Sequence, residues 1–306
     1  MKQDILILGA GELGLAVVEA LAKHPLHSQA KLTVLLRQST LDTAAPEKKR
    51  TVHHLKGLGA DFEGADMAAA PASELSAIFK KYDTIISCSG MALPPGTQTK
   101  ITEAVLDAGV KRYIPWQFGM DYDVIGEGSS QDLFDEQLAV RKLLRGQDKT
   151  TWTIVSVGVF MSFLFDPWFN IVNIKKKTVN ALGSWDTTIT ATTPEDIGRV
   201  VAEVVLHPKE LAEQSGIVYT AGDTVSYGQL ADLVEARCGT SFQCELWDLE
   251  ALKKEMADNP SGRFKYWDAF AQGRGVAWPR EKTINHERGI ATTDIKTYLE
   301  KMELDH

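Results

Sequence analysis

An apolar run near the start of the chain leads directly into a glycine-rich turn and then into a helical pattern. Residues 5–8 read Ile-Leu-Ile-Leu, and glycines with the spacing G-x-G-x-x-G follow at Gly9, Gly11 and Gly14. In this order the first glycine permits a tight turn, the second admits a pyrophosphate to the backbone, and the third allows close helix packing. The anion would lie at the helix N-terminus, beside Glu12 and Leu13. The sequence therefore predicts a dinucleotide-binding turn; the alternative is a turn that serves packing alone.

The end of the second apolar run indicates which dinucleotide the turn holds. This run, at 32–36, is followed by Arg37 instead of the Asp or Glu that hydrogen-bonds a free ribose 2′-hydroxyl. A guanidinium forms forked, charge-assisted bonds to phosphate, and Ser39 and Thr40 add hydroxyl donors. Three more cations follow at Lys48, Lys49 and Arg50. The pattern favours NADPH over NADH; otherwise Arg37 ends an exposed strand and the three cations begin a solvated helix.

Composition and charge restrict the class of protein. The chain has 306 residues, of which 44% are apolar, so a packed core is readily formed. A formal charge of −8 without a basic stripe argues against nucleic acid as a ligand. The three cysteines lack C-x-x-C spacing, and no apolar run suits a signal peptide or a membrane helix. We expect a cytoplasmic protein without a metal, nucleic-acid or membrane partner, and the sequence leaves a homodimer open.

Strand and helix signals alternate through the first half of the chain. We expect strands at 4–8, 32–36, 61–62, 83–88 and 111–115, and helices at 12–23, 45–57, 72–81 and 97–108. Such alternation predicts an α/β fold, a Rossmann-type doubly wound parallel sheet. Ligands of these sheets lie outside the carboxyl ends of the strands. Ser87, Ser89 and Gly90 end the fourth strand and are therefore candidates for cofactor binding.

After the fifth strand the pattern becomes less regular. A charged helix over 131–145 and a strand over 152–157 precede an aromatic segment that contains Phe160, Phe163, Phe165 and Trp168. Because aromatic side chains line ligand cavities as well as cores, these four predict either a pocket for a small aromatic substrate or ordinary packing. Further helices are expected after Thr193, as N-cap, and over 226–237 and 248–256. We expect an NADP-binding domain over 1–158 and a smaller substrate lobe over 159–306, with return segments to the first domain left open.

The segment 111–119 resembles a known family. It reads K-R-Y-I-P-W-Q-F-G and is similar to the K-R-F-x-P-S-E-F-G segment of the isoflavone and phenylcoumaran benzylic ether reductases, which are NmrA-like atypical short-chain dehydrogenases. The glycine turn, L-L-R-Q-S-T at 35–40 and I-I-S at 85–87 match further motifs in the same order. The resemblance covers roughly residues 4–165 and, more weakly, 193–198. It implies a Rossmann-type fold, NADP(H) as cofactor, Lys48 near a second phosphate-contacting lysine, and Gln117, Phe118 and Gly119 beside the nicotinamide.

One departure from the family pattern bears on mechanism. The family's catalytic lysine falls in a helix written V-F-E-x-K-x-x-V-R-R, and Gln137 occupies its place here. An amide can hold a substrate oxygen or the nicotinamide ribose, but it cannot exchange a proton near neutral pH. A proton would then come from another group, with Tyr122 as the leading candidate and Asp121, Asp135, Glu136 or a relayed water as alternatives.

Two classes of function remain in view. The first is an NADPH-dependent reductase of a small aromatic or quinone-like compound, favoured by the family resemblance and by the aromatic segment. The second is an NADP-binding regulatory protein of the NmrA type, which senses the state of the cofactor and is favoured by the missing lysine.

Overall fold

The computed structural model describes residues 2–212, 214–259 and 262–303, which form two compact units. Unit 1 draws on residues 1–117, 136–155 and 197–218, and unit 2 draws on residues 118–135, 156–196 and 219–306. The chain therefore passes from one unit to the other several times.

Unit 1 is built on a seven-stranded sheet with the order β11-β6-β5-β4-β1-β2-β3. Its strands are β1 (Gln3–Leu8), β2 (Ala30–Leu36), β3 (Asp61–Gly64), β4 (Thr84–Ser87), β5 (Arg112–Ile114), β6 (Thr151–Ser156) and β11 (Gly216–Tyr219). From β6 to β3 all neighbours pair in parallel. The chain fills the sheet in one direction from β1 to β3 and in the other from β4 onward, so the topological switch point lies between β1 and β4. The predicted α/β doubly wound fold is confirmed.

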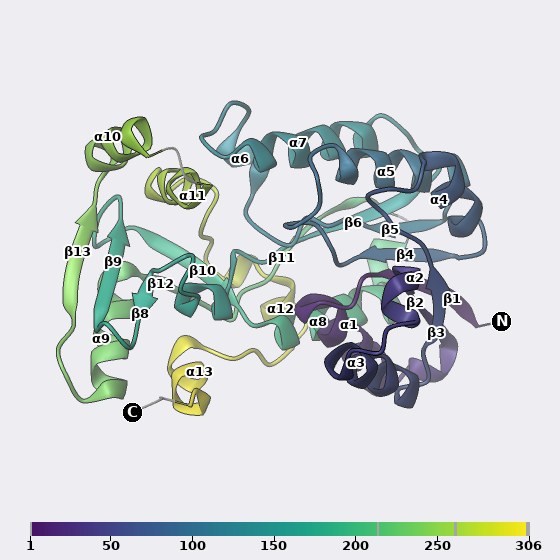
Figure 1. Ribbon diagram of the computed structural model, residues 1–306, viewed down its shortest axis with the longest axis horizontal. Coiled ribbons are helices and arrows are strands. Elements are labelled where there is room, and N and C mark those ends of the chain that lie inside the picture. Colours follow the sequence, from purple (N-terminus) through teal and green to yellow (C-terminus); the bar gives the residue numbers. More distant parts are fainter. Residues whose placement is uncertain (1, 213, 260–261, 304–306) are drawn as a thin grey trace. The chain divides into compact units, whose positions relative to one another are not determined.

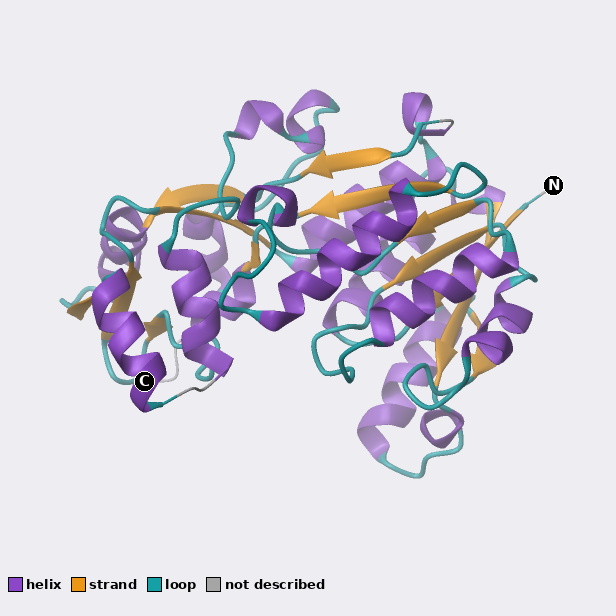
Figure 2. Ribbon diagram, turned by 90° about the horizontal axis from the view of Figure 1, so that it is seen from above, coloured by secondary structure: helices purple, strands orange, loops and turns teal. Residues whose placement is uncertain are grey.

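Helices cover both faces of this sheet (Figure 1). On one face lie α4 (Ala72–Phe79), α5 (Thr97–Ala108) and α7 (Asp132–Arg145); on the other lie α1 (Glu12–Lys23), α3 (Pro46–Gly57) and α8 (Pro194–Leu206). Ile5, Leu6, Ile7 and Leu8 of β1 are all 0% exposed. Parallel strands covered on both faces have this continuous apolar sequence, which is why the first run contains no alternation. Figure 2 shows the strands running side by side with helices packed over them.

A glycine lets α8 approach α1 closely. A Cβ atom at Gly198 would lie 2.5 Å from the backbone oxygen of Ala16, so no larger residue fits without moving the helices apart. The Glu203 carboxylate of α8 pairs with His24, which directly follows α1, at 3.2 Å, and with His207, which follows α8 itself, at 2.8 Å. Burial works to raise the pKa of Glu203, but the two histidine hydrogen bonds outweigh it and hold that pKa below its usual value. The segment that contains α8 is thus an integral part of unit 1.

Unit 2 contains two small sheets, with the orders β12-β10-β7 and β13-β9-β8. The strands are β7 (Val159–Phe160), β8 (Val172–Asn173), β9 (Thr178–Leu182), β10 (Thr188–Thr192), β12 (Asp223–Ser226) and β13 (Gln243–Trp247). The helices are α6 (Tyr122–Ile125), α9 (Tyr227–Cys238), α10 (Leu249–Asp258), α11 (Gly262–Ala271), α12 (Ile284–Glu287) and α13 (Ile295–Lys301). Sequence patterns predicted α8, α9 and α10 but none of these strands, which are only two to five residues long.

The predicted helix starts are confirmed by their caps. The Thr193 hydroxyl accepts from the Asp196 N–H at 3.2 Å, and Ser226 forms a capping box with Gln229. Asp248 caps α10 in the same way, through the Ala251 N–H. Over the described residues, we find no helix with the length and apolar character needed to cross a membrane.

Candidate functional site

The three glycines of the first turn are required for different reasons. Gly9 has a φ of +94°, and a Cβ there would overlap the hydroxyl of Ser89. A Cβ at Gly14 would overlap the backbone oxygen of Gly9. At Gly11, by contrast, φ is −75° and no atom lies within 4 Å of the Cβ position. The fold therefore demands glycine at the first and third positions, whereas at the second it leaves open space.

The open space at Gly11 lies at the N-terminus of α1. Gly11 is the N-cap of this helix and has no side chain to accept a hydrogen bond from it. The first N–H groups of a helix have no acceptor within the helix, so they are available to an anion. The side chain of Leu13 is buried, so this residue offers only its backbone, while Glu12 is exposed. Backbone donors and the missing Cβ together fit the pyrophosphate of a dinucleotide.

The end of β4 meets this turn at the switch point. Leu8 of β1 pairs with Ser87 of β4, whose side chain is 0% exposed, so it faces the interior. Ser89 is half-buried, and its hydroxyl lies directly beside Gly9, in the space that a side chain at this glycine would need. Gly90 lies against the Trp116 ring, which likewise leaves no room for a side chain. Of the three predicted residues, Ser89 is the one whose side chain borders the turn.

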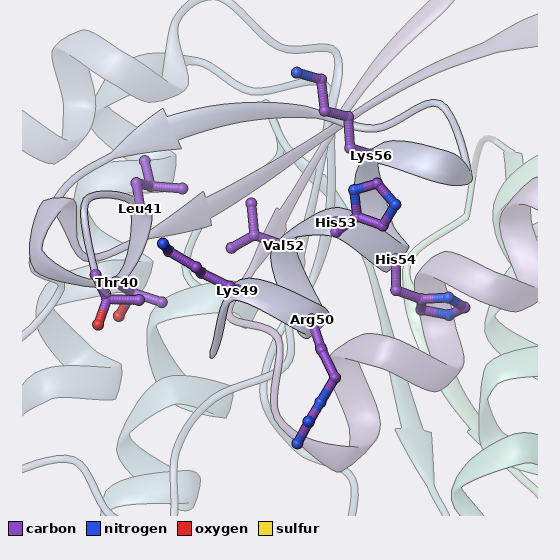
Figure 3. A pocket seen from close by; sticks show the side chains of 9 residues that line it. Thr40, Leu41, Lys49, Arg50, Val52, His53, His54 and Lys56 are labelled. Atoms are coloured by element: carbon purple, nitrogen blue, oxygen red, sulfur yellow. The ribbon is translucent and has the colours of Figure 1, made fainter. Parts of the chain in front are cut away.

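A basic hollow of about 620 Å³ lies between α2 (Gln38–Leu41) and α3 (Figure 3). Its lining combines hydroxyl, apolar and cationic side chains: Thr40, Leu41, Thr43, Lys49, Arg50, Val52, His53, His54 and Lys56. In Figure 3 the Lys49 side chain extends toward α2, whereas Arg50 points away from it. Arg37 and Ser39 are exposed beside this region, and the Thr40 N–H donates to the Arg37 oxygen at 2.8 Å. Lys48, the lysine that the resemblance indicates, is exposed but does not line the hollow.

The cations of this basic hollow are largely unneutralised. Within residues 2–212, 214–259 and 262–303, the side chains of Lys49, Arg50 and Lys56 form no salt bridge or hydrogen bond, whereas His54 pairs with Glu19 at 2.8 Å. No acidic residue occurs from Lys48 to Lys56, although the chain as a whole carries a charge of −8. Unpaired cations beside hydroxyl groups form a surface suited to phosphate. The sequence indicated Lys48 as a phosphate contact and did not indicate Lys56. Only the folded helix α3 shows which of its side chains line the hollow.

A buried hydrogen-bond network joins the segment after β5 to α7. Nε2 of Gln117 donates to the backbone oxygen of Gln137 at 3.0 Å and to its Oε1 at 2.8 Å. Nε of Arg141 donates to Oε1 of Gln117 at 2.9 Å. Gln117 is 1% exposed, and Gln137 and Arg141 are 0% exposed. Position 137, where the resembling family has its lysine, is therefore a neutral residue inside a polar network.

The carboxylates proposed as alternative proton donors all accept hydrogen bonds from other residues. Glu136 accepts from the Gln98 N–H at 2.8 Å, and Asp135 accepts from the Gly128 N–H at 3.0 Å. Asp121 accepts from the Tyr219 hydroxyl at 2.6 Å. Each of these carboxylates therefore already accepts a hydrogen bond within the protein.

The turn after Gln117 is packed against Tyr122. The hydroxyl of Tyr122 occupies the position that a Cβ at Gly119 would take, so this turn requires glycine. The Gly119 oxygen accepts from the N–H groups of Val157 and Gly158 at 2.9 and 3.0 Å. Phe118 and Tyr122 are buried, and the Tyr122 ring lies 5.1 Å from that of Phe134. The phenol thus has a defined place at the turn.

The aromatic segment divides into separate groups. Phe163 stacks on Phe169 with centroids 4.5 Å apart and lies 5.8 Å from Trp168, which is 45% exposed. Phe165 instead stacks on Tyr298 at 5.6 Å, and Phe160 is half-buried in β7. Two of the four predicted substrate residues therefore lie together. Across the part of the chain that the structure describes, no group of three or more His, Cys, Asp or Glu side chains could hold a metal ion.

The parallel sheet with its glycine turn at the switch point defines a Rossmann-type protein. The family model of the NmrA-like family matches residues 1–286, and the chain belongs to this family. It is 55% identical over 306 residues to an NmrA-like family domain-containing oxidoreductase of Gibberella moniliformis, with 99% of each chain covered. It is 29% identical to phenylcoumaran benzylic ether reductase 1 of Arabidopsis thaliana, over 84% of this chain and 82% of that one. The solved structure of AtPrR2 with NADP+ and (+)pinoresinol has the same fold, with a TM-score of 0.78, 17% identity and 98% of each chain covered.

Proposed function

We propose that this chain is an NADPH-dependent oxidoreductase that reduces a small aromatic or quinone-like compound. The observation that carries the proposal is the open space at Gly11, where the fold itself does not require glycine but a bound pyrophosphate would. The chain belongs to a family whose relatives are named oxidoreductases and reductases, and this supports an oxidation–reduction reaction. The AtPrR2 structure, which holds NADP+ and an aromatic ligand on the same fold, supports both cofactor and substrate class.

In this proposal the cofactor is held by residues of unit 1. The backbone at Gly11, Glu12 and Leu13 binds the pyrophosphate, and Arg37 with Ser39 binds the 2′-phosphate. Lys48 and the two lysines of the basic hollow, Lys49 and Lys56, add positive charge. Around the switch point we assign contacts to Ser89, to the backbone of Ser87 and Gly90, and to Gln117. When bound, the reduced nicotinamide supplies a hydride to the substrate.

Further residues are proposed to act on the substrate side. Phe118 and Gly119 continue the chain from Gln117 and are assigned a place beside the nicotinamide. Phe163 and Trp168, with Phe160 and Phe165, are proposed to hold the aromatic substrate. Tyr122 is proposed to donate a proton to the substrate, because a phenol remains protonated at neutral pH and its hydroxyl borders the Gly119 turn.

A second candidate function is that of an NADP-binding regulatory protein. The observation that favours it is the neutral, fully buried side chain at position 137, which cannot exchange protons near neutral pH. Such a protein would bind the cofactor in the same way but would not oxidise it.

The first expected result concerns cofactor choice. We expect NADPH to bind at least about tenfold more tightly than NADH, which corresponds to about 1.4 kcal/mol, because Arg37 and the unpaired cations of α3 attract the 2′-phosphate. Titration of both nucleotides, followed by tryptophan fluorescence, measures the ratio. Arg37→Ala should bring the two affinities close together. Equal affinities in the wild type, or an unchanged preference in Arg37→Ala, would contradict the assignment.

The second expected result concerns chemistry. In an assay of NADPH oxidation with aromatic ketones, enones and quinones, we expect turnover by the wild type and a loss of about a hundredfold in Tyr122→Phe. Phenylalanine keeps the ring contact with Phe134 and removes only the hydroxyl, so nucleotide affinity should stay unchanged. Intact turnover in Tyr122→Phe would remove this donor. NADPH binding without oxidation across the whole panel would favour the regulatory function.

A further inference from the structure

Hydrogen bonds join Arg141, Gln117 and Gln137. The guanidinium of Arg141 fixes which group donates and which accepts in each of them. Arginine has only donors, so its Nε must meet an oxygen, and Oε1 of Gln117 lies 2.9 Å away. The nitrogen of the Gln117 amide therefore faces Gln137, where it meets two acceptors, the backbone oxygen and Oε1. The nitrogen and oxygen of an amide are easily interchanged in a structure, but here the guanidinium decides both orientations.

In this orientation the amide nitrogen of Gln137 has no partner among the described residues. Gln137 is 0% exposed, and its Nε2 meets no acceptor among the described residues. Buried amide N–H groups are rarely unpaired in folded proteins, because an unpaired donor lowers stability unless a water or a ligand accepts from it. The network begins at Gln117, three residues beyond the carboxyl end of β5, and doubly wound sheets bind their ligands at this edge.

We propose that Nε2 of Gln137 is a hydrogen-bond donor for a neutral oxygen of a bound ligand, and that Arg141 holds it in this orientation through Gln117. The acceptor is a hydroxyl or carbonyl oxygen, supplied by the nicotinamide riboside part of the cofactor or by the substrate. An amide donates this bond without releasing its proton, so Gln137 orients its ligand and transfers nothing. The naming of the ligand rests on the proposed function, whereas the orientation of the two amides does not.

The variant Gln137→Glu keeps the oxygen that accepts from Gln117 and removes the N–H donor that we propose for the ligand. Its carboxylate still accepts from Gln117 and lies one helical turn from Arg141, but it has no N–H to offer a ligand. We expect an unfolding temperature close to that of the wild type. Either the Kd for NADP+ or the KM for the substrate should rise at least about tenfold, which is about 1.4 kcal/mol. A rise in Kd assigns the acceptor to the cofactor, and a rise in KM alone assigns it to the substrate.

The variant Gln117→Glu tests the orientation without any change at position 137. A carboxylate at 117 still accepts from Arg141, but toward Gln137 it presents an acceptor instead of a donor. The Gln137 amide must then turn its nitrogen inward, so the ligand loses the same hydrogen bond. We expect the same rise in Kd or KM as in Gln137→Glu.

Gln147→Glu is the matched control. Gln147 also lies in unit 1, and its Nε2 donates to the oxygens of Leu144 and Thr150, both at 3.0 Å. This exchange should lower the unfolding temperature and leave nucleotide affinity unchanged.

The proposal is overturned if Gln137→Glu and Gln117→Glu both bind NADP+ and turn over as the wild type does. A wild type that binds neither nucleotide would instead overturn the proposed function.

Discussion

Replacement of Gly11 by valine should abolish the binding of NADPH and NADH while the protein remains folded. Valine is compatible with the φ of −75° at this position, and its Cβ would meet no atom of the fold within 4 Å. The branched side chain would instead fill the space in front of the first N–H groups of α1, which the pyrophosphate needs. We expect a loss of at least about a hundredfold in affinity, or about 2.7 kcal/mol.

The matched control for this change is Gly216→Val in β11. A Cβ at Gly216 also meets no atom within 4 Å, and the position lies in unit 1, on the edge strand of the same sheet. Circular dichroism and thermal unfolding should show both variants folded, and only Gly11→Val should fail to bind. Full nucleotide affinity in Gly11→Val would mean that the first turn serves packing alone.

The change Gln137→Lys should strongly destabilise the fold. It would place an ammonium group in a fully buried position, facing the N–H₂ group of Gln117 and one helical turn from the guanidinium of Arg141. An uncompensated buried charge costs about 3–5 kcal/mol, a large share of the roughly 5–15 kcal/mol that stabilises a folded domain. Thermal unfolding should therefore occur about 10 °C lower or more. The lysine of the resembling family is thus not restored by one exchange.

A second exchange should rescue much of this loss. In the double variant Gln117→Glu with Gln137→Lys, the carboxylate keeps the bond from Arg141 and also accepts from the ammonium, so the new buried cation gains an anionic partner. The family segment K-R-F-x-P-S-E-F-G has glutamate at this position, where the present chain has Gln117. A double-mutant cycle on the unfolding free energy measures the coupling. If the two exchanges were additive, positions 117 and 137 would not act as a pair.

The parts of the molecule that follow from local sequence were predictable. The helix over 12–23 and the helix over 97–108 match α1 and α5 to the residue. Both have an apolar face; α1 begins after Gly11, and α5 lies between Gly96 and Gly109. Arg37 could be placed at the end of β2 because strand, turn and charge are adjacent in the chain. Among the strands of unit 2, β7 and β8 could not be predicted, since they contain only two residues each and β7 pairs with β10, which lies far along the chain.

The hydrogen bonds and contacts of the candidate site join residues that lie far apart in the sequence, so they could not be predicted from it. Gln137 could be recognised as a replacement for lysine, but its bond to a side chain twenty positions earlier in the chain requires the packed structure. Tyr122 could be proposed as a donor because it follows the F-G pair, yet the contact of its hydroxyl with Gly119 appears only when the turn is formed. Likewise, the hollow beside α3 combines residues that sequence spacing alone does not place on one side of a helix.

The interleaving of the two units has a consequence for the order in which the protein folds during synthesis. Unit 1 contains β1 near the beginning of the chain, but β11 and most of α8 come from residues 197–218. Translation at about 5–20 residues per second would separate the emergence of β6 from that of β11 by roughly 3–12 s. During this interval β6 is an open sheet edge, and open edges readily pair with other chains. A nascent chain arrested before residue 197 should accordingly engage chaperones, and a shortened protein that ends there should aggregate.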